Sequence, residues 1–194
     1  MMPPVEILFS EEQIRSRTAR LAEELTAFYR GRPLTAVILL NGGLFFAADL
    51  LRSIRLPLQV DTLSVSSYEN DRSSGKLSIR APLKLSPEGR HLLLIDDILD
   101  TGLTLAKTIE FLQNAGAASV RACVLLDKIL PPGQSKLASC DWYGFRVPNH
   151  YVVGFGLDSG ERFRNLPWIG KISPGKASSP RQAEDKEQEK KKES

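Results

Sequence analysis

The stretch that decides the fold reads LLLIDDILDTGLT and covers residues 92–104. Its first four residues are apolar, as in a strand buried on both faces of a parallel sheet. Two carboxylates, Asp96 and Asp97, follow directly, and a turn containing Gly102 leads into a helical pattern. Like charges at the end of a buried strand are costly to desolvate, so a packing role does not explain them. The pair therefore indicates a binding site.

The turn DTGLT at residues 100–104 offers groups suited to an anion. Backbone N–H groups in the first helical turn lack intrahelical partners, and the helix dipole favours an anion there by about 0.3–1 kcal/mol. The hydroxyls of Thr101 and Thr104 add donors. Carboxylates for a sugar diol and amides for a phosphate together describe a ribose 5-phosphate. The simpler alternative, in which Asp100 or Thr101 only caps the helix, leaves the acidic pair unexplained.

Short apolar runs alternate with amphipathic helices along the chain. The predicted elements are a helix from the Ser10–Gln13 capping box to about Gly31, helices over 44–54 and from Gly102 to 114–116, and strands over 35–40, 58–65, 91–95 and 120–126. This order predicts an α/β fold with a central, mainly parallel sheet flanked by helices, in which ligands bind beyond the carboxyl ends of the strands. Residues 66–80 are polar and are predicted to form a mobile loop or a weak hairpin.

Composition and charge exclude several classes of protein. Residues 1–170 contain 19 Lys and Arg against 18 Asp and Glu, which argues against a nucleic-acid-binding surface. Cys123 and Cys140 show no disulfide or zinc spacing, and Cys123 is predicted to be a core residue. No segment approaches 18 apolar residues and no signal peptide is recognisable, so we expect a cytoplasmic protein without a membrane span.

The end of the chain differs in composition from the rest. Residues 173–194 are rich in Pro, Ser, Lys and Glu and contain almost nothing apolar. Such a segment cannot offset the entropy lost on ordering, so we predict a disordered charged tail after a single domain over residues 1–172.

The segment IDDILDTG at 95–102 resembles the phosphoribosyl pyrophosphate loop of the type I phosphoribosyltransferases. Other segments are similar to the hypoxanthine(-guanine) branch of that family: 39–50 (LLNGGLFFAADL) to its pyrophosphate loop, 66–68 (SSY) to its mobile lid, and 152–158 (VVGFGLD) with 163–164 (FR) to its C-terminal site. The resemblance runs from about Phe9 to about Ile172, and four motifs in the right order make it specific. It implies the type I phosphoribosyltransferase fold, with a small hood and a mobile lid loop.

The resemblance also implies roles for the residues around the sugar. Asp96 and Asp97 would hold the ribose 2′- and 3′-hydroxyls, with the short Asp96 reaching through water because the family often has Glu there. Asp100 would accept the proton at N7 of the purine as N9 attacks C1′. The implied cradle for the 5′-phosphate consists of Thr101, Gly102, Leu103 and Thr104.

The purine site is implied in the same way. Lys128 would donate to the exocyclic O6 of the base, which disfavours an amino group there and hence adenine. Tyr151 would stack on the base, and Val152 would supply backbone contacts. Alternatively, Asp127 and Lys128 form a plain surface ion pair and Tyr151 belongs to a strand core.

The pyrophosphate site is implied to consist of Asn41, Gly42, Gly43 and Arg164. The family frequently has Lys or Arg in place of Asn41, so this departure puts some pyrophosphate affinity and any subunit coupling in question. Taken alone, the two glycines also fit an ordinary strand-to-helix turn, and Arg164 also fits a solvated loop beginning at Asp158.

The implied reaction is a Mg²⁺-dependent transfer from phosphoribosyl pyrophosphate to a 6-oxopurine base. Asp158, Asp96 and Asp97 would hold the metal, partly through water. Ser67 and Tyr68 would close over the reacting centre and exclude water. A homodimer or homotetramer is also implied, because the pyrophosphate loop of the family usually meets a neighbouring subunit.

Two other interpretations stay open from the sequence. One is a non-catalytic, nucleotide-binding regulator with this fold, although the retained Asp100, Lys128 and lid pair argue against it. The other is an enzyme of the same fold that prefers another base, such as xanthine. The ranking of hypoxanthine, guanine and xanthine depends on backbone placement at the base edge, which the sequence does not define.

Overall fold

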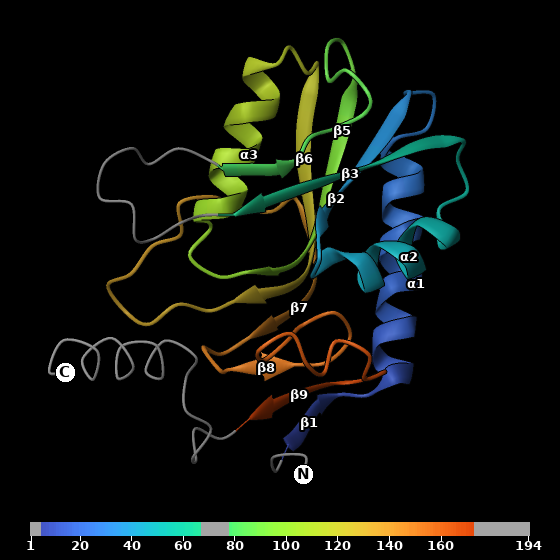
Figure 1. The fold of residues 1–194 in the computed structure, drawn as a ribbon. Helices are drawn as coiled ribbons and strands as arrows, with labels where there is room; N and C mark the ends of the chain where they lie inside the picture. Colours follow the sequence, from blue (N-terminus) through green and yellow to red (C-terminus); the bar gives the residue numbers. More distant parts are fainter. Residues whose placement is uncertain (1–4, 67–77, 173–194) are drawn as a thin grey trace, which may run out of the picture.

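The computed structural model describes residues 5–66 and 78–172. The predicted lid pair, Ser67 and Tyr68, and the predicted tail lie outside the described residues. The elements are β1 (Val5–Phe9), α1 (Glu11–Phe28), β2 (Leu34–Leu40), α2 (Gly43–Ser53), β3 (Leu58–Ser66), β4 (Ser78–Ala81), β5 (His91–Leu99), α3 (Leu103–Asn114), β6 (Ser119–Lys128), β7 (Trp142–Val147), β8 (Val152–Val153) and β9 (Ile169–Ile172). They form a six-stranded sheet and a three-stranded sheet (Figure 1).

The large sheet has the strand order β4-β3-β2-β5-β6-β7. All neighbouring strands in it are parallel except the β3–β4 pair. Helices α1 and α2 cover one face and α3 covers the other (Figure 1). The predicted α/β fold with a central, mainly parallel sheet is therefore confirmed.

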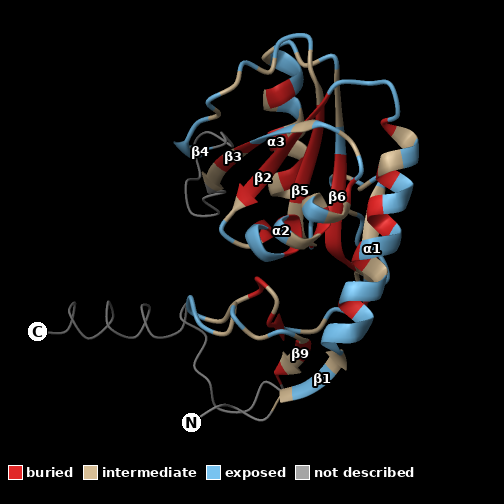
Figure 2. Cartoon of the chain, turned by 90° about the vertical axis from the view of Figure 1, so that its right-hand side faces the viewer, coloured by how far each residue is buried: buried red, intermediate tan, exposed pale blue. Residues whose placement is uncertain are grey.

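Strand β5 shows why an apolar run specifies the centre of this sheet. Leu93 and Ile95 pack into the cluster beneath α1 and α2, whereas Leu92 and Leu94 pack into the cluster beneath α3. All four side chains are fully buried, and each contributes about 1.5–3 kcal/mol by the usual transfer scale. Figure 2 shows the same burial along the neighbouring strands β2 and β6.

Helix α1 begins as predicted. The Ser10 hydroxyl accepts from the Gln13 N–H at 3.3 Å, and the Gln13 side chain accepts from the Ser10 N–H at 2.8 Å. The apolar stripe that follows is buried against the sheet. No helix within residues 5–66 and 78–172 is long and apolar enough to cross a membrane.

Two predicted boundaries change in the structure. The strand predicted over 91–95 continues to Leu99, because β5 stays paired with β6 after its ladder with β2 has ended at Ile95. The acidic pair therefore lies within the last part of a strand rather than after it. In the segment predicted as a loop or weak hairpin, β4 pairs antiparallel with β3, which supports the hairpin for the described arms.

The small sheet, in the order β1-β9-β8, was predicted only as a small hood. Its strands come from opposite ends of the described chain, and Val5 pairs with Ile172. Figure 1 shows this sheet lying apart from the large sheet, at the end reached by the carboxyl termini of β2, β5 and β6. The fold thus leaves a site region between the two sheets.

Candidate active site

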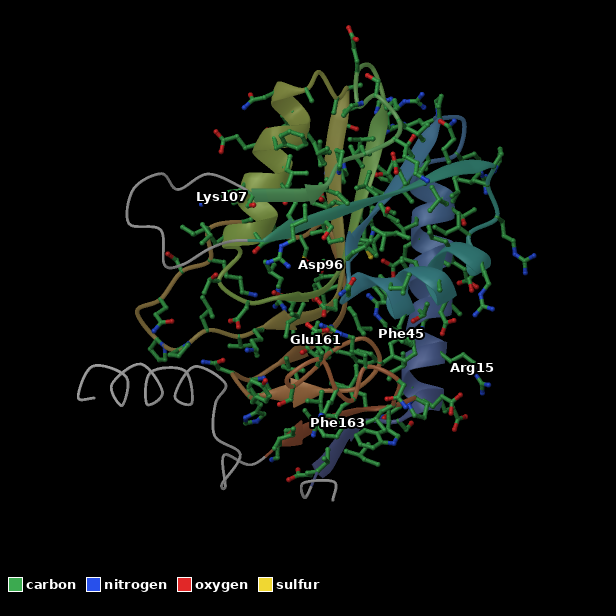
Figure 3. All side chains as sticks on the ribbon, in the orientation of Figure 1. Arg15, Phe45, Asp96, Lys107, Glu161 and Phe163 are labelled. Carbon is green, nitrogen blue, oxygen red and sulfur yellow. The ribbon has the colours of Figure 1, made fainter. Side chains whose placement is uncertain are left out.

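The predicted site residues gather at the carboxyl ends of neighbouring parallel strands. The loop 41–43 follows β2, the segment 96–104 ends β5 and begins α3, and Lys128 is the last residue of β6. Figure 3 shows Asp96 at the lower end of the large sheet, with Glu161 of the facing loop below it. Parallel strands bring these segments to one edge, as expected for an α/β ligand site.

Asp96 and Asp97 are partly buried, and their two carboxyl groups lie close to each other. Asp96 Oδ1 accepts from the Asp97 N–H at 2.9 Å, and the two carboxyl groups interact. Burial raises the pKa of Asp96 well above its usual value, and the Asp97 charge raises it further. Burial also raises the pKa of Asp97, although hydrogen bonds and the Arg164 charge oppose that shift. Such a pair is suited to a diol or a cation, either of which would compensate the buried charge.

The glycines after β2 allow a close approach to this pair. A Cβ at Gly42 would lie 1.9 Å from Asp97 Oδ2, and a Cβ at Gly43 would lie 2.9 Å from the Ile95 carbonyl oxygen. The preceding Leu40–Asn41 peptide is cis. The interpretation as an ordinary strand-to-helix turn does not account for these contacts, so the glycines do more than terminate β2.

The predicted phosphate turn has a left-handed residue at its centre. Gly102 has φ +80°, and a Cβ there would lie 2.8 Å from the Ala138 nitrogen. The Thr101 hydroxyl accepts a long hydrogen bond, 3.4 Å, from the Leu103 N–H. The N-cap of α3 is Gly102, without a side-chain cap hydrogen bond, so the capping alternative fails for Thr101. It also fails for Asp100, whose carboxylate pairs elsewhere.

Asp100 and Lys128 form an ion pair, with Lys128 Nζ 2.8 Å from Asp100 Oδ2. The Lys128 side chain is only 12% exposed, while that of Asp100 is half exposed. Asp127 binds Lys136 and Arg146 instead, so the plain surface pair of Asp127 with Lys128 is wrong. The structure thus brings the predicted proton acceptor and the predicted base-recognition residue into contact.

Arg164 organises the loop that follows β8. Its guanidinium donates to the Gly156 carbonyl oxygen at 2.7 Å and pairs with Asp158 at 2.9 Å and Glu161 at 3.0 Å. A Cβ at Gly156 would lie 2.4 Å from the Gly42 carbonyl oxygen, so this loop packs directly on the predicted pyrophosphate loop. The loop is therefore held by contacts at Gly156, Asp158 and Arg164, while residues 160–162 are exposed to solvent.

The aromatic residue predicted to stack on a base is available for contact. Tyr151 is 54% exposed, whereas Val152 beside it is buried in β8. Tyr151 is therefore not a strand-core residue.

The acidic side chains do not form a preassembled metal site among the described residues. Within the described part of the chain, no group of three or more His, Cys, Asp or Glu side chains is arranged to hold a metal ion. The carboxylates available are the partly buried pair Asp96 and Asp97, and Asp158, which forms an ion pair with Arg164. Mg²⁺ commonly uses one or two carboxylates together with waters and substrate phosphates, so this donor set fits it.

Two contributors to the site were not foreseen from the sequence. Glu161 pairs with Arg164, and the Leu137 N–H donates to the Thr101 carbonyl oxygen at 2.9 Å. Both lie in irregular segments whose local sequence carries no recognisable motif. Only the glycine at position 102 indicated a close approach by another backbone segment, which is residues 137–138.

The comparisons with known proteins agree with this geometry. A family model described as the phosphoribosyl transferase domain matches residues 5–159. A crystal structure of a hypoxanthine phosphoribosyltransferase from Staphylococcus aureus superposes with a TM-score of 0.81 at 38% identity, covering 87% of this chain and 91% of that one. Fold and site together define the class as type I phosphoribosyltransferases.

The relatives narrow that class. The hypoxanthine-guanine phosphoribosyltransferase of Bacillus subtilis is 43% identical over 169 residues, which cover 87% of this chain and 93% of the relative. The bifunctional protein TilS/HprT of Listeria innocua is also 43% identical, and there the chain spans 26% of the relative's length. This chain belongs to the hypoxanthine(-guanine) phosphoribosyltransferase family.

Proposed function

We propose that this protein transfers the phosphoribosyl group from phosphoribosyl pyrophosphate to hypoxanthine, guanine or both, releasing pyrophosphate and the nucleoside monophosphate in purine salvage. The observation that carries the proposal is the Asp100–Lys128 ion pair, which lies at the same sheet edge as Asp96, Asp97 and the turn at residues 101–104. A base, a sugar and a phosphate each find suitable groups at this edge of the sheet.

The ribose 5-phosphate is proposed to lie along the end of β5. Asp96 and Asp97 accept hydrogen bonds from the two ribose hydroxyls, which supply donors to two carboxyl groups whose pKa values are raised by desolvation. The 5′-phosphate sits on the turn at residues 101–104, at the N-terminus of α3. It is remote from C1′ and serves to position the sugar for attack.

Lys128 is proposed to recognise the base, and Asp100 to activate it. Lys128 donates to O6, and Asp100 takes the N7 proton as the N9 lone pair forms the bond to C1′ and the bond to pyrophosphate breaks. Because Lys128 Nζ lies 2.8 Å from Asp100 Oδ2, both groups can contact the same base. Tyr151 offers an exposed ring for stacking, and Val152 offers backbone groups at the base edge.

The leaving pyrophosphate is proposed to bind between Arg164 and the loop Asn41–Gly43. Arg164 already lies close enough for its charge to act on Asp97, and its loop touches Gly42. Asp158, Asp96 and Asp97 would hold Mg²⁺, which, when bound, neutralises charge that develops on pyrophosphate. The Gly42 and Gly43 backbone permits the close approach of this polyanion.

Three further expectations complete the proposal. Ser67 and Tyr68 close over the site, the protein works in the cytoplasm, and it assembles as a homodimer or homotetramer. Sedimentation velocity of the purified chain checks the last of these, and a single monomeric species at micromolar concentration would contradict it.

A base panel tests the proposed function. The measurement is kcat/KM for hypoxanthine, guanine, xanthine and adenine, each with phosphoribosyl pyrophosphate and Mg²⁺. Hypoxanthine or guanine should react best, and adenine should be poorer by at least about a hundredfold, since Lys128 rejects an amino group. Nucleotide binding without turnover of any base would favour the regulator. A clear preference for xanthine would favour the alternative enzyme.

A further inference from the structure

The segment 129–141, which joins β6 to β7, supports the phosphate turn from behind. The Leu137 N–H donates to the Thr101 carbonyl oxygen at 2.9 Å, and the backbone of Ala138 occupies the space where a Cβ of Gly102 would lie. The same segment lines a cavity of about 780 Å³ together with Lys128 and the end of β5. The turn therefore depends on a second segment for its shape.

The contact between Leu137 and Thr101 orients the amides of the turn. In a planar trans peptide the C=O and the N–H point in opposite directions. Since the Thr101 carbonyl points to Leu137, the N–H of Gly102 points away from the segment 129–141. Backbone amides bind an anion only when they converge on it, so this hydrogen bond favours the orientation that a phosphate requires.

Asp127 anchors the supporting segment. Its side chain is nearly buried, with the whole residue 8% exposed, and it accepts from Lys136 and from Arg146. Lys136 is itself mostly buried, with 18% of its side chain exposed. The contact between Asp127 and Lys136 is held firmly, because separating the two would leave the mostly buried Lys136 ammonium without a counter-charge. Lys136 directly precedes Leu137, so the ion pair fixes the residue that binds the turn.

Asp127 also links this support to the base site. It precedes Lys128 on β6 and is paired in register with Leu99 on β5. The strand that carries Lys128 and the segment that shapes the phosphate turn are therefore joined at one carboxylate.

We propose that Asp127 is a positioning residue, which acts through Lys136 to hold residues 136–138 against the phosphate turn and thereby sets the affinity for the 5′-phosphate. The proposal rests on the proposed function, in that the turn at 101–104 is taken to bind that phosphate. Asp127 touches no substrate atom in this arrangement, and its effect is on binding rather than on chemistry.

The test compares Asp127→Asn and Lys136→Met with Arg146→Met as the matched control. Arg146 is the other partner of Asp127, but its side chain is 61% exposed and its strand β7 does not include the residues that touch the turn. Asp127→Asn and Lys136→Met should each raise KM for phosphoribosyl pyrophosphate by about five- to tenfold, the effect of a lost charged hydrogen bond. KM for hypoxanthine should change less than about twofold, and Arg146→Met should leave both constants within about twofold.

A purely structural role predicts a different result. It would lower the unfolding temperature while leaving the KM for phosphoribosyl pyrophosphate unchanged, or would move both KM values together, and either outcome overturns the proposal. Should Asp127→Asn fail to fold, Lys136→Met carries the test, because it leaves Asp127 paired with Arg146. Lys136→Arg, which keeps the cation, should restore most of the affinity.

Calorimetric titration with ribose 5-phosphate separates this inference from the proposed function. If the unmodified protein turns over no base, the proposed function fails. Weaker binding of ribose 5-phosphate by Lys136→Met than by Arg146→Met would still support the positioning role. Equal binding by the two variants would overturn it.

Discussion

The replacement of Gly102 by alanine tests the structure of the phosphate turn. Two terms add at this position. A non-glycine residue at φ +80° carries a strain of about 1–2 kcal/mol. A Cβ 2.8 Å from the Ala138 nitrogen meets backbone rather than a flexible side chain, and such overpacking costs about 1–3 kcal/mol. The sum is roughly 2–5 kcal/mol, or a fall in Tm of about 5–20 °C for a domain of this size.

Gly133→Ala is the matched control. Gly133 has φ +84°, but a Cβ there would meet nothing within 4 Å. It carries the strain term alone, so it should lose about 1–2 kcal/mol. Urea unfolding of both variants and the unmodified protein gives the two losses, and their difference measures the close approach between the turn and residue 138.

The reasoning about this turn is refuted if the two variants lose equal stability. Activity gives a second readout, since Gly102→Ala displaces the amides proposed to bind the 5′-phosphate. Its KM for phosphoribosyl pyrophosphate should rise at least about tenfold, whereas Gly133→Ala should leave KM within about twofold.

Four other predictions follow from the site. Asp100→Asn should lower kcat by about a hundredfold or more while nucleoside monophosphate binding changes little, and an equal loss of both would make Asp100 structural. Lys128→Ala should reduce the preference for hypoxanthine over adenine at least about tenfold, and unchanged selectivity would remove it from the base site. Folding raises the pKa of Asp97, so Asp97 stabilises the folded state at acidic pH, and this stabilisation declines as the pH rises above the ordinary pKa of 3.8. Asp97→Asn should therefore make the free energy of unfolding, measured by urea titration, fall less steeply between about pH 4 and 7. An unchanged slope would contradict the raised pKa of Asp97. Deleting residues 173–194 should leave kcat/KM within about twofold, and a large loss would contradict the disordered-tail prediction.

The sequence predicts the structure best where an apolar strand leads directly into polar site residues. The apolar run before Asp96 could belong only to a strand covered on both faces, and the turn around Gly102 could only precede a helix. The proximity of Asp100 to Lys128 also follows from strand order, since each is the next residue after a pair, Leu99 with Asp127, in the β5–β6 ladder. That pair lies in the part of β5 beyond the predicted end at residue 95, so the proximity of Asp100 to Lys128 needed the full β5–β6 ladder.

Other features depend on contacts between distant segments and could not be predicted locally. The short strands β1, β8 and β9 each lack a sufficient apolar pattern, and they exist because opposite ends of the chain pair with each other. The predicted end of β5 was too early, because Asp96 and the residues after it remain hydrogen-bonded to β6 as far as Leu99 despite the polarity of the two acids. The pairing of Asp127 with Lys136 likewise depends on the path of residues 129–141, which have no regular structure, whereas Arg146 lies opposite Asp127 in the β6–β7 ladder.

Phosphorus NMR of the purified chain with phosphoribosyl pyrophosphate, hypoxanthine and Mg²⁺ tests the central claim most directly. We expect the signals of the donor to be replaced, one for one, by those of a nucleoside monophosphate and free pyrophosphate, and only when the base is present. Donor signals that persist, or that decay to ribose 5-phosphate and pyrophosphate without any nucleotide, would contradict the account.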